Sequence, residues 1–346
     1  MLGNTFMDMA PGSFNGQGYD SAMLDWFAQE VGRVGGILEL SMQPNASLST
    51  FTSDMYEKLA TQLLEINTKY GLPVFLRYGH EMNGDWNFYG NQPTAYKASF
   101  RAMALAVRAK TNMTAMVWAP NIGITYPFRG GGFVESPNPG GLDFRVLDTN
   151  QDGKIDNNDD PYTPFYPGDD VVDWVGVSLY NYPFPGCFNC AVEPTYFNDY
   201  LTGQGPVAEK GAIVTAAYTA VHNFYQMFCS KESHNKPLMI PETGSPWFLE
   251  YANMAGAQSE TVVKSGWWNQ LLSASTMAKF PKMKLVVNFE ETKPGWPLGT
   301  EVSQNWKVAN TTSQISMFTG LLNTYMPTLL QSKDLVYSCD GKVLQI

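Results

Sequence analysis

The chain has 346 residues, of which 16% are charged and 14% are aromatic, and its formal net charge is −10. This acidic, lightly charged composition excludes nucleic acid as a partner, because phosphate neutralisation requires clustered Lys and Arg. A membrane-spanning protein is excluded as well, because no apolar run approaches the roughly 18 residues that a span requires. The abundance of Trp and Tyr suits a neutral sugar polymer, whose rings stack on aromatic faces.

Strand patterns and helix patterns alternate along the whole chain. Apolar runs predict seven strands, at about residues 5–9, 35–40, 74–79, 113–119, 171–179, 237–241 and 284–289. Helical spacing of apolar residues predicts helices at about 19–32, 53–70, 94–111, 214–228, 259–277 and 313–329. The alternation indicates a parallel α/β sheet with right-handed crossovers, and the length fits one barrel domain over residues 1–346. A long Gly- and Pro-rich insertion follows the fourth of these strands, at about 122–168.

The cysteines favour one disulfide. Cys187 and Cys190 form a C-x-x-C pair in a Pro- and Gly-rich loop. A lone pair of this kind lacks the further ligands that a zinc site needs, so a bond between the two cysteines is the favoured interpretation. The sequence leaves open whether Cys229 pairs with Cys339.

Glycosylation signals point toward export. Three N-x-S/T sequons occur, at Asn45, Asn112 and Asn310. Together with the even number of cysteines, they favour a secreted, extracellular protein. No apolar signal segment follows Met1, so the chain is expected to be a mature or clipped form.

Two glutamates stand where predicted strands end. Glu81 follows the strand at 74–79, and Glu242 follows the one at 237–241. In α/β barrels such positions carry the catalytic groups, and both carboxyl groups could therefore point into one cleft. Cleavage of a glycosidic bond uses two carboxyl groups, one to donate a proton and one to attack carbon or activate water.

The surroundings of the two glutamates predict different roles. Burial of Glu81 beside Trp86 favours the protonated form, as an acid needs. A hydrogen bond from Tyr180 would hold Glu242 ionised. Asn83 and Asn121 are expected either to hold sugar hydroxyls or to serve as ordinary turn residues.

Several segments together resemble one enzyme family. They are Pro73-Val-Phe-Leu-Arg77 with His80-Glu-Met-Asn-Gly-Asp-Trp86, Val117-Trp-Ala-Pro-Asn121, residues 166–176 with Tyr180, Glu242, and Phe289-Glu-Glu-Thr-Lys293 with Asn305-Trp-Lys307. The first is similar to the acid/base motif of glycoside hydrolase family 26, which comprises β-mannanases and their relatives. The likeness covers roughly residues 5 to 320.

This resemblance implies a (β/α)8 TIM barrel and a retaining double displacement. Glu81 is then the acid/base and Glu242 the nucleophile. The residues expected to contact substrate or to arrange the site around it are His80, Asn83, Trp86, Trp118, Asn121, Tyr180 and Trp306. Of these, Tyr180 would bond the nucleophile, while Trp86 and Trp306 would form a platform for the sugar.

The resemblance also predicts a shortened barrel. The strand at 74–79 corresponds to the family's fourth but is the third here, so the first β-strand and its helix are expected to lie before Met1. The wall between the strands at 5–9 and 284–289 is then expected to be open, or filled by residues 343–346.

The implied substrate is a β-linked polysaccharide, cleaved most simply by an endo-β-1,4-mannanase. Two alternatives are a β-1,3-1,4-glucanase or a β-1,3-xylanase of the same family, and a barrel that binds polysaccharide without cleaving it. A monomer without an organic cofactor is expected.

An acidic stretch within the insertion predicts a structural Ca²⁺ site. Acidic or amide oxygens stand at the EF-hand loop positions 1, 3, 5, 9 and 12, with Gly153 at position 6. The expected ligands are Asp148, Asn150, Asp152, the carbonyl of Lys154, Asp156 and Asp159. The alternative is a solvated acidic turn.

Overall fold

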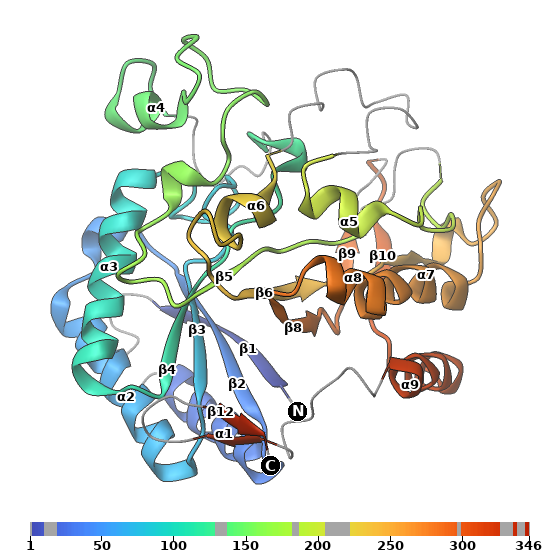
Figure 1. Ribbon diagram of the computed structural model, residues 1–346, viewed down its shortest axis with the longest axis horizontal. Coiled ribbons are helices and arrows are strands. Elements are labelled where there is room, and N and C mark those ends of the chain that lie inside the picture. The colour runs from blue at the N-terminus through green and yellow to red at the C-terminus, as the bar shows by residue number, and fades with distance from the viewer. Residues whose placement is uncertain are drawn as a thin grey trace. The chain divides into compact units, whose positions relative to one another are not determined.

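The computed structural model describes residues 2–9, 19–128, 137–181, 187–204, 222–295, 299–325, 335–337 and 343–345 (Figure 1). The chain divides into two compact units. Unit 1 comprises Met1–Gly176 and Leu330–Ile346, and unit 2 comprises Val177–Leu329. Each unit carries one of the two glutamates, and each is described by itself.

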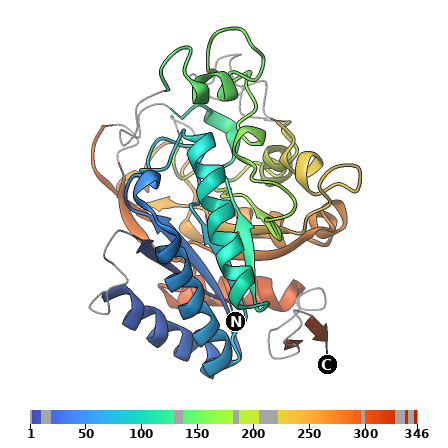
Figure 2. The ribbon, with the colours of Figure 1, turned by 90° about the vertical axis from the view of Figure 1, so that its left-hand side faces the viewer.

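Unit 1 contains a parallel sheet in the order β1-β2-β3-β4-β5. Its strands are β1 (Leu2–Met9), β2 (Ile37–Pro44), β3 (Val74–Tyr78), β4 (Thr114–Trp118) and β5 (Trp174–Gly176). The long helices are α1 (Tyr19–Arg33), α2 (Ser53–Tyr70) and α3 (Pro93–Lys110). Figure 2 shows these three helices on one face of the strands. The sheet therefore follows the βα alternation that the sequence predicts.

Burial explains why these segments form strands and helices. β2 is buried along nearly its whole length, as is typical of a parallel strand covered on both faces. The stripe of Leu59, Leu63 and Ile66 on α2 is likewise buried, which holds the helix against the sheet. The helix ends at Gly71, whose φ of 61° is a left-handed conformation that favours glycine.

The described part of the insertion in unit 1 forms short elements. They are η2 (Gly123–Thr125), α4 (Leu142–Leu147) and η3 (Thr163–Phe165). Another short helix of unit 1, η1 (Leu48–Thr50), lies outside the insertion and follows β2. Two ion pairs join the residues that precede β5 to α3. Arg101 contacts Asp170 at 2.7 Å, and Arg108 contacts Asp173 at 2.9 Å. The end of the insertion is thus fixed to the body of unit 1.

Unit 2 contains parallel strands β6 (Leu238–Thr243) and β8 (Met283–Asn288). Its helices are α5 (Tyr196–Leu201), α6 (Phe224–Phe228), η6 (Leu249–Tyr251), α7 (Glu260–Leu272), α8 (Ala274–Lys279) and α9 (Thr312–Tyr325). A small antiparallel sheet has the order β7-β10-β9, formed by Trp247–Phe248, Val302–Asn305 and Thr292–Gly295. The chain just after β5 also bonds β6, because the N–H groups of Val177 and Leu179 donate to the carbonyls of Met239 and Glu242.

The seven predicted strands are confirmed, five in unit 1 and two in unit 2, and within the described residues they follow the strand order of a (β/α)8 barrel. The strand predicted at 171–179 is shorter, since β5 spans only Trp174–Gly176. The single helix predicted at 259–277 is wrong. Ser273 ends α7 and caps α8 by accepting the N–H of Thr276, which separates the two helices. The predicted helix at 214–228 falls partly outside the described residues, which contain its end as α6.

The wall that is expected to be open lies between β1 of unit 1 and β8 of unit 2, and its opening stays a prediction. Among the described residues, β1 pairs only with β2 in unit 1, and β8 pairs only with β6 in unit 2. The C-terminal strands β11 (Leu335–Tyr337) and β12 (Val343–Gln345) pair with each other as a separate sheet. The C-terminal segment therefore does not extend the parallel sheet.

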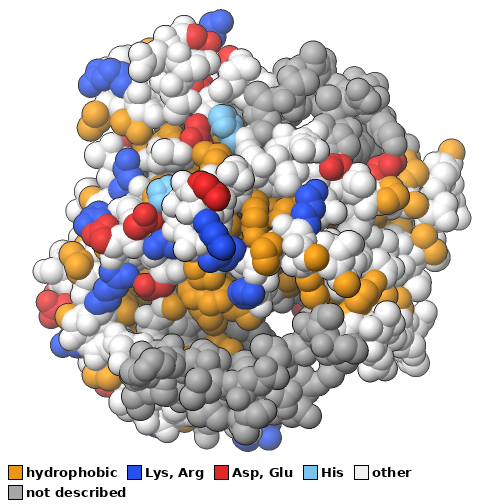
Figure 3. All heavy atoms as spheres, viewed as in Figure 1, with side chains coloured by type: hydrophobic (Ala, Val, Ile, Leu, Met, Phe, Trp, Pro, Cys, Tyr) orange, Lys and Arg blue, Asp and Glu red, His pale blue; other side chains and the backbone are white. Residues whose placement is uncertain are grey.

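The predicted disulfide is present. Cys187 and Cys190 are bonded, with their Cα atoms 5.4 Å apart. Cys229 is buried, and Cys339 lies outside the described residues. None of the helices in the described ranges is long and apolar enough to cross a membrane. On the face shown in Figure 3, Lys and Arg side chains are interspersed with Asp and Glu.

Candidate active site

Glu81 lies just after β3 in a strained backbone conformation. Its φ is 54°, in the left-handed region that residues with a side chain rarely adopt. Its N–H donates to the carbonyl of Ala119, at 2.8 Å, just after β4. Such a conformation costs about 1–2 kcal/mol and persists where the surroundings impose it, which is common at functional sites. The sequence gives no sign of this strain.

Two N–H donors hold the Glu81 carboxyl group. The indole Nε1 of Trp86 donates to Oε2 at 2.8 Å, and the amide Nδ2 of Asn121 donates to Oε1 at 3.1 Å. Glu81 itself is half-buried. Each carboxyl oxygen therefore has a fixed direction, as a group that transfers a proton to a bound substrate needs.

The side chain of Asn83 bonds the backbone of the loop that carries Asn121. Its side chain is fully buried and makes two hydrogen bonds with the backbone of Asn121, one to the carbonyl at 2.8 Å and one from the N–H at 2.9 Å. The expectation that Asn83 holds a sugar hydroxyl is therefore replaced by a supporting role, because its amide positions the residue that bonds Glu81. The sequence could not distinguish the two roles, since both require an amide in this loop.

Trp118 also lies in the core. Its ring has no exposed surface and packs edge-on against Tyr166, with ring centroids 5.0 Å apart. The expected contact between Trp118 and substrate conflicts with this burial. It is the last residue of β4, and its ring forms part of the packing beneath the loop that carries Asn121.

His80 lies at the base of the same loop, 8% exposed. Its ring is 5.6 Å from that of Phe6, in an edge-to-face arrangement. Its carbonyl accepts hydrogen bonds from Tyr89, at 2.7 Å, and from Asn87, at 3.3 Å. These contacts fix the residue before Glu81, whereas a contact between His80 and sugar stays a prediction.

The Trp86 ring lies against Gly84 on one side and Phe128 on another. A Cβ atom on Gly84 would lie only 2.4 Å from the ring, so this position requires glycine. The Phe128 ring packs edge-on at 5.2 Å. Phe128 belongs to the insertion, and the sequence analysis did not single it out. Its position means that the insertion helps to shape the surroundings of Glu81.

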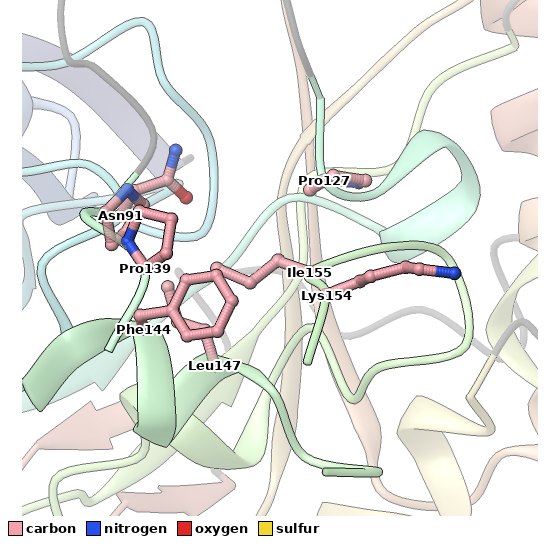
Figure 4. A pocket seen from close by; sticks show the side chains of 8 residues that line it. Asn91, Pro127, Pro139, Phe144, Leu147, Lys154 and Ile155 are labelled. Carbon is pink, nitrogen blue, oxygen red and sulfur yellow. The ribbon is translucent and has the colours of Figure 1, made fainter. Parts of the chain in front are cut away.

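A cavity of about 290 Å³ lies beside this part of the insertion (Figure 4). Its lining residues are Asn91, Pro127, Pro137, Pro139, Phe144, Leu147, Lys154 and Ile155. Figure 4 shows Phe144 and Ile155 close together, with the Lys154 ammonium group extending away from them. The lining is mostly apolar, so the cavity lacks the converging polar groups that a sugar site requires.

In unit 2, Glu242 lies on β6 and is 7% exposed. The hydroxyl of Tyr180 donates to its Oε2 at 2.5 Å, as the sequence predicted. The neighbouring strands hold its backbone, because Leu179 donates its N–H to the Glu242 carbonyl and Phe289 donates to the carbonyl of Thr243. The hydroxyl donor fixes the direction of one carboxyl oxygen, and a nucleophile needs a fixed direction of this kind.

Three aromatic rings surround the end of β6. The Tyr180 ring lies 4.9 Å from that of Trp306 and 6.0 Å from that of Phe289. A Cβ atom on Gly244 would lie 3.2 Å from the Trp306 ring, so little room exists beneath it. Trp306 is only 4% exposed. Its predicted place near Glu242 is therefore supported through Tyr180, whereas stacking on sugar stays a prediction.

The acidic loop of the insertion closes on its own N–H groups. Asp148 accepts hydrogen bonds from the N–H groups of Asp152 and Gly153, both at 3.0 Å. Gly153 has a φ of 83°, which fits the turn that an EF-hand loop makes at its sixth position. Asp159 is buried and accepts the N–H of Thr149 at 2.6 Å. No group of three His, Cys, Asp or Glu side chains is placed to hold a metal ion in the described ranges.

Comparison with known proteins gives a family match around Glu81. The model of glycosyl hydrolase family 26 matches residues 40–128, the segment from β2 to Phe128 that contains Glu81 and both of its donors. No sequence among curated proteins matches the chain. The family match does not reach Glu242.

Solved structures share the fold at low identity. A family 26 β-mannanase from Bacteroides ovatus is 16% identical, with a TM-score of 0.50 over 96% of this chain and 81% of that one. A modular endo-β-1,4-mannanase from Cellulomonas fimi is 12% identical, with a TM-score of 0.50 over 99% of this chain and 67% of that one. A fungal β-1,4-galactanase is also 12% identical, with a TM-score of 0.50 over 91% and 86%. At this identity the likeness concerns the fold.

The family match around Glu81, on a chain with the fold of these hydrolases, supports a glycoside hydrolase. The resemblance to glycoside hydrolase family 26 is confirmed.

Proposed function

We propose that the protein is a retaining endo-β-1,4-mannanase in which Glu81 is the acid/base and Glu242 the nucleophile. The observation that carries this proposal is that a carboxyl group with fixed hydrogen-bond donors stands at the end of a parallel strand in each unit. Glu81 is oriented by two N–H donors in a strained loop, and Glu242 accepts a short hydrogen bond from Tyr180. Several structural neighbours are mannanases, which favours mannan over other β-glycans as the substrate.

In the first half of the reaction, a carboxylate oxygen of Glu242 forms a bond to the anomeric carbon. The bond between that carbon and the glycosidic oxygen breaks, and the leaving oxygen takes the proton of Glu81. Tyr180 holds Glu242 ionised until the attack. Positive charge that develops on the sugar ring is stabilised by the same carboxylate.

In the second half, Glu81 is ionised and removes a proton from a water molecule. The water oxygen bonds to the anomeric carbon, the bond to Glu242 breaks, and both carboxyl groups return to their starting states. Two displacements at one carbon retain its configuration. Asn121 and Trp86 keep the Glu81 oxygens in place through both steps, because a hydrogen-bond donor can serve either protonation state by a small adjustment.

A screen of polysaccharides tests this proposal. We expect hydrolysis of β-1,4-mannan to exceed that of mixed-linkage glucan, β-1,3-xylan and β-1,4-galactan by at least about tenfold in kcat/KM, an energy difference of about 1.4 kcal/mol. Proton NMR of the first products should show the β-anomer before mutarotation. Preference for another glycan would contradict mannan as the substrate. Release of the α-anomer would contradict the retaining mechanism, and binding without cleavage would favour a polysaccharide-binding barrel.

We also propose that the loop at 148–159 binds one structural Ca²⁺ ion. The ligands would be Asp148, Asn150, Asp152, the Lys154 carbonyl, Asp156 and Asp159. The positive φ of Gly153 supports the required turn, and each carboxylate oxygen that accepts an N–H retains a further lone pair. A bound ion would offset the repulsion among the acidic side chains, which with one amide make five oxygen-bearing groups within twelve residues.

Calorimetric titration with CaCl₂ tests the ion site. We expect one ion per chain, and a stabilisation of about 2.7 kcal/mol when free calcium is a hundredfold above Kd. Asp148→Ala and Asp152→Ala should lose the binding heat, whereas Asp54→Ala, a change in an exposed acid on α2, should retain it. Absence of binding heat and of thermal stabilisation in the parent protein would contradict the proposal.

We infer further that the protein acts outside the cell as a monomer. The asparagines of all three sequons are exposed, which glycosylation requires, and the Cys187–Cys190 bond is of a kind that persists in oxidising compartments.

A further inference from the structure

Unit 2 contains a buried ammonium group that the proposed chemistry does not use. Lys264 lies on α7, and its side chain has no exposed surface. It contacts Glu260, one helical turn earlier, at 2.6 Å, and the Glu260 side chain is 17% exposed. Lysine is almost never fully buried unless paired, because removing its charge from water is costly. Burial accordingly lowers the pKa of Lys264, and the Glu260 carboxylate opposes that shift.

The pair bonds the segment that carries Trp306. Lys264 donates from Nζ to the carbonyl of Lys307, directly after the tryptophan. Asn305, directly before it, donates from Nδ2 to Oε1 of Glu260 at 2.7 Å. The two charges of one ion pair therefore hold the two residues that flank Trp306.

A second set of contacts holds the same segment from the other side. The N–H of Trp306 donates to the carbonyl of Glu291 at 2.9 Å. The N–H groups of Val308 and Ala309 donate to the Glu290 carboxylate at about 3 Å. The backbone N–H groups from Trp306 to Ala309 and the Lys307 carbonyl thus have partners, and the Trp306 ring packs against Tyr180.

We propose that Lys264 and Glu260 are positioning residues for the sugar-binding site at Glu242. They hold Trp306, Trp306 supports Tyr180, and Tyr180 bonds the carboxylate, as the contacts of 4.9 Å and 2.5 Å show. This inference rests on the proposed function of Glu242. According to this inference, two side chains of α7 fix the position of the loop that follows β10, more than forty residues later in the chain.

Stability alone does not account for this arrangement. A buried ion pair adds little net stability over an apolar pair of similar volume, because desolvation offsets the attraction. An apolar pair would, however, leave the Lys307 carbonyl and the Asn305 amide without partners, and the loop could take other conformations. The expected consequence of losing the pair is therefore a displaced Trp306 and weaker substrate binding.

Lys264→Met tests the inference, because it preserves much of the side-chain volume. We expect KM for mannohexaose to rise at least tenfold while kcat falls less than fivefold. The indole N–H resonance of Trp306, assigned with Trp306→Phe, should shift in the ligand-free enzyme. Lys58→Met is the control, because it removes the exposed ion pair between Asp54 and Lys58, which has the same spacing on α2. It should change neither KM nor the Trp306 resonance.

A double-mutant cycle separates positioning from general destabilisation. If Lys264 acts through the ring, Lys264→Met combined with Trp306→Ala should lower kcat/KM no further than Trp306→Ala alone. Glu260→Gln serves as a second variant if Lys264→Met does not fold. Additive effects, or an unchanged Trp306 resonance, would overturn the inference. A parent enzyme without glycosidase activity would instead refute the proposed function, and the resonance shift would still report on the positioning.

Discussion

Replacement of Glu242 by Ala is expected to lower kcat on mannan by roughly 10⁴-fold or more, which corresponds to at least about 5.5 kcal/mol of lost transition-state stabilisation. The carboxylate forms the covalent bond in the first displacement, and no other group in the proposed chemistry can replace it. Folding should be retained, because Ala fits a position on β6 that is held by backbone bonds of Leu179 and by the pairing of Thr243. Initial rates and circular dichroism would check both expectations.

Azide distinguishes a lost nucleophile from a damaged site. In Glu242→Ala, azide can occupy the vacated space and attack an activated aryl β-mannoside, and the product should be the α-mannosyl azide. Glu232→Ala, a change in an exposed carboxylate of unit 2, should remain fully active. A rate within tenfold of the parent for Glu242→Ala, or a β-mannosyl azide product, would remove the nucleophile role from Glu242.

Replacement of Glu81 by Ala is expected to have a large effect that depends on the leaving group. Without its acid, hydrolysis of mannan should slow by about 10²–10⁴-fold, the usual contribution of general acid catalysis. A dinitrophenyl β-mannoside needs no proton on its leaving group, so formation of the glycosyl-enzyme should slow far less. Pre-steady-state release of the phenol would measure this first step. Equal losses on both substrates would contradict the acid role, and Glu65→Ala on α2 provides an exposed control.

The strained backbone at Glu81 also predicts how two substitutions there affect the stability of the protein. At a φ of 54°, Ala retains the clash of its Cβ atom, whereas Gly does not. Glu81→Gly should therefore be more stable than Glu81→Ala by about 1 kcal/mol, after allowance for the greater freedom of glycine in the unfolded chain. Urea unfolding of the two inactive variants would measure the difference. Greater stability of Glu81→Ala would show that the loop relaxes when the carboxyl group is removed.

Much of the fold follows from patterns within short stretches. The buried run before Glu81 and the apolar stripe of α2 each specify an element without knowledge of the rest, because strand and helix periods differ. Boundaries were less secure where two helices meet. Ser273 can continue a helix or cap a new one, and only the hydrogen bond from Thr276 shows which occurs.

Some features of the candidate site could likewise be predicted from the sequence, and others could not. Glu81, Glu242 and the bond from Tyr180 could be predicted, because chemistry demands those residue types at strand ends and the motif around Glu81 is specific. The roles of Asn83 and Trp118 could not, because an amide or an indole near a carboxylate can face either substrate or core. Burial of both side chains and the two bonds between Asn83 and Asn121 favour a supporting role.

The sequence by itself determined the order of strands, which depends on local periodicity, and its motif around Glu81 carried the resemblance that implies glycoside hydrolysis. The tertiary structure decided which side chains are available and which support others. Phe128 against Trp86, and Lys264 beneath the loop of Trp306, are contacts between segments about forty residues apart. Such contacts depend on how whole elements pack, and no pattern within one segment encodes them.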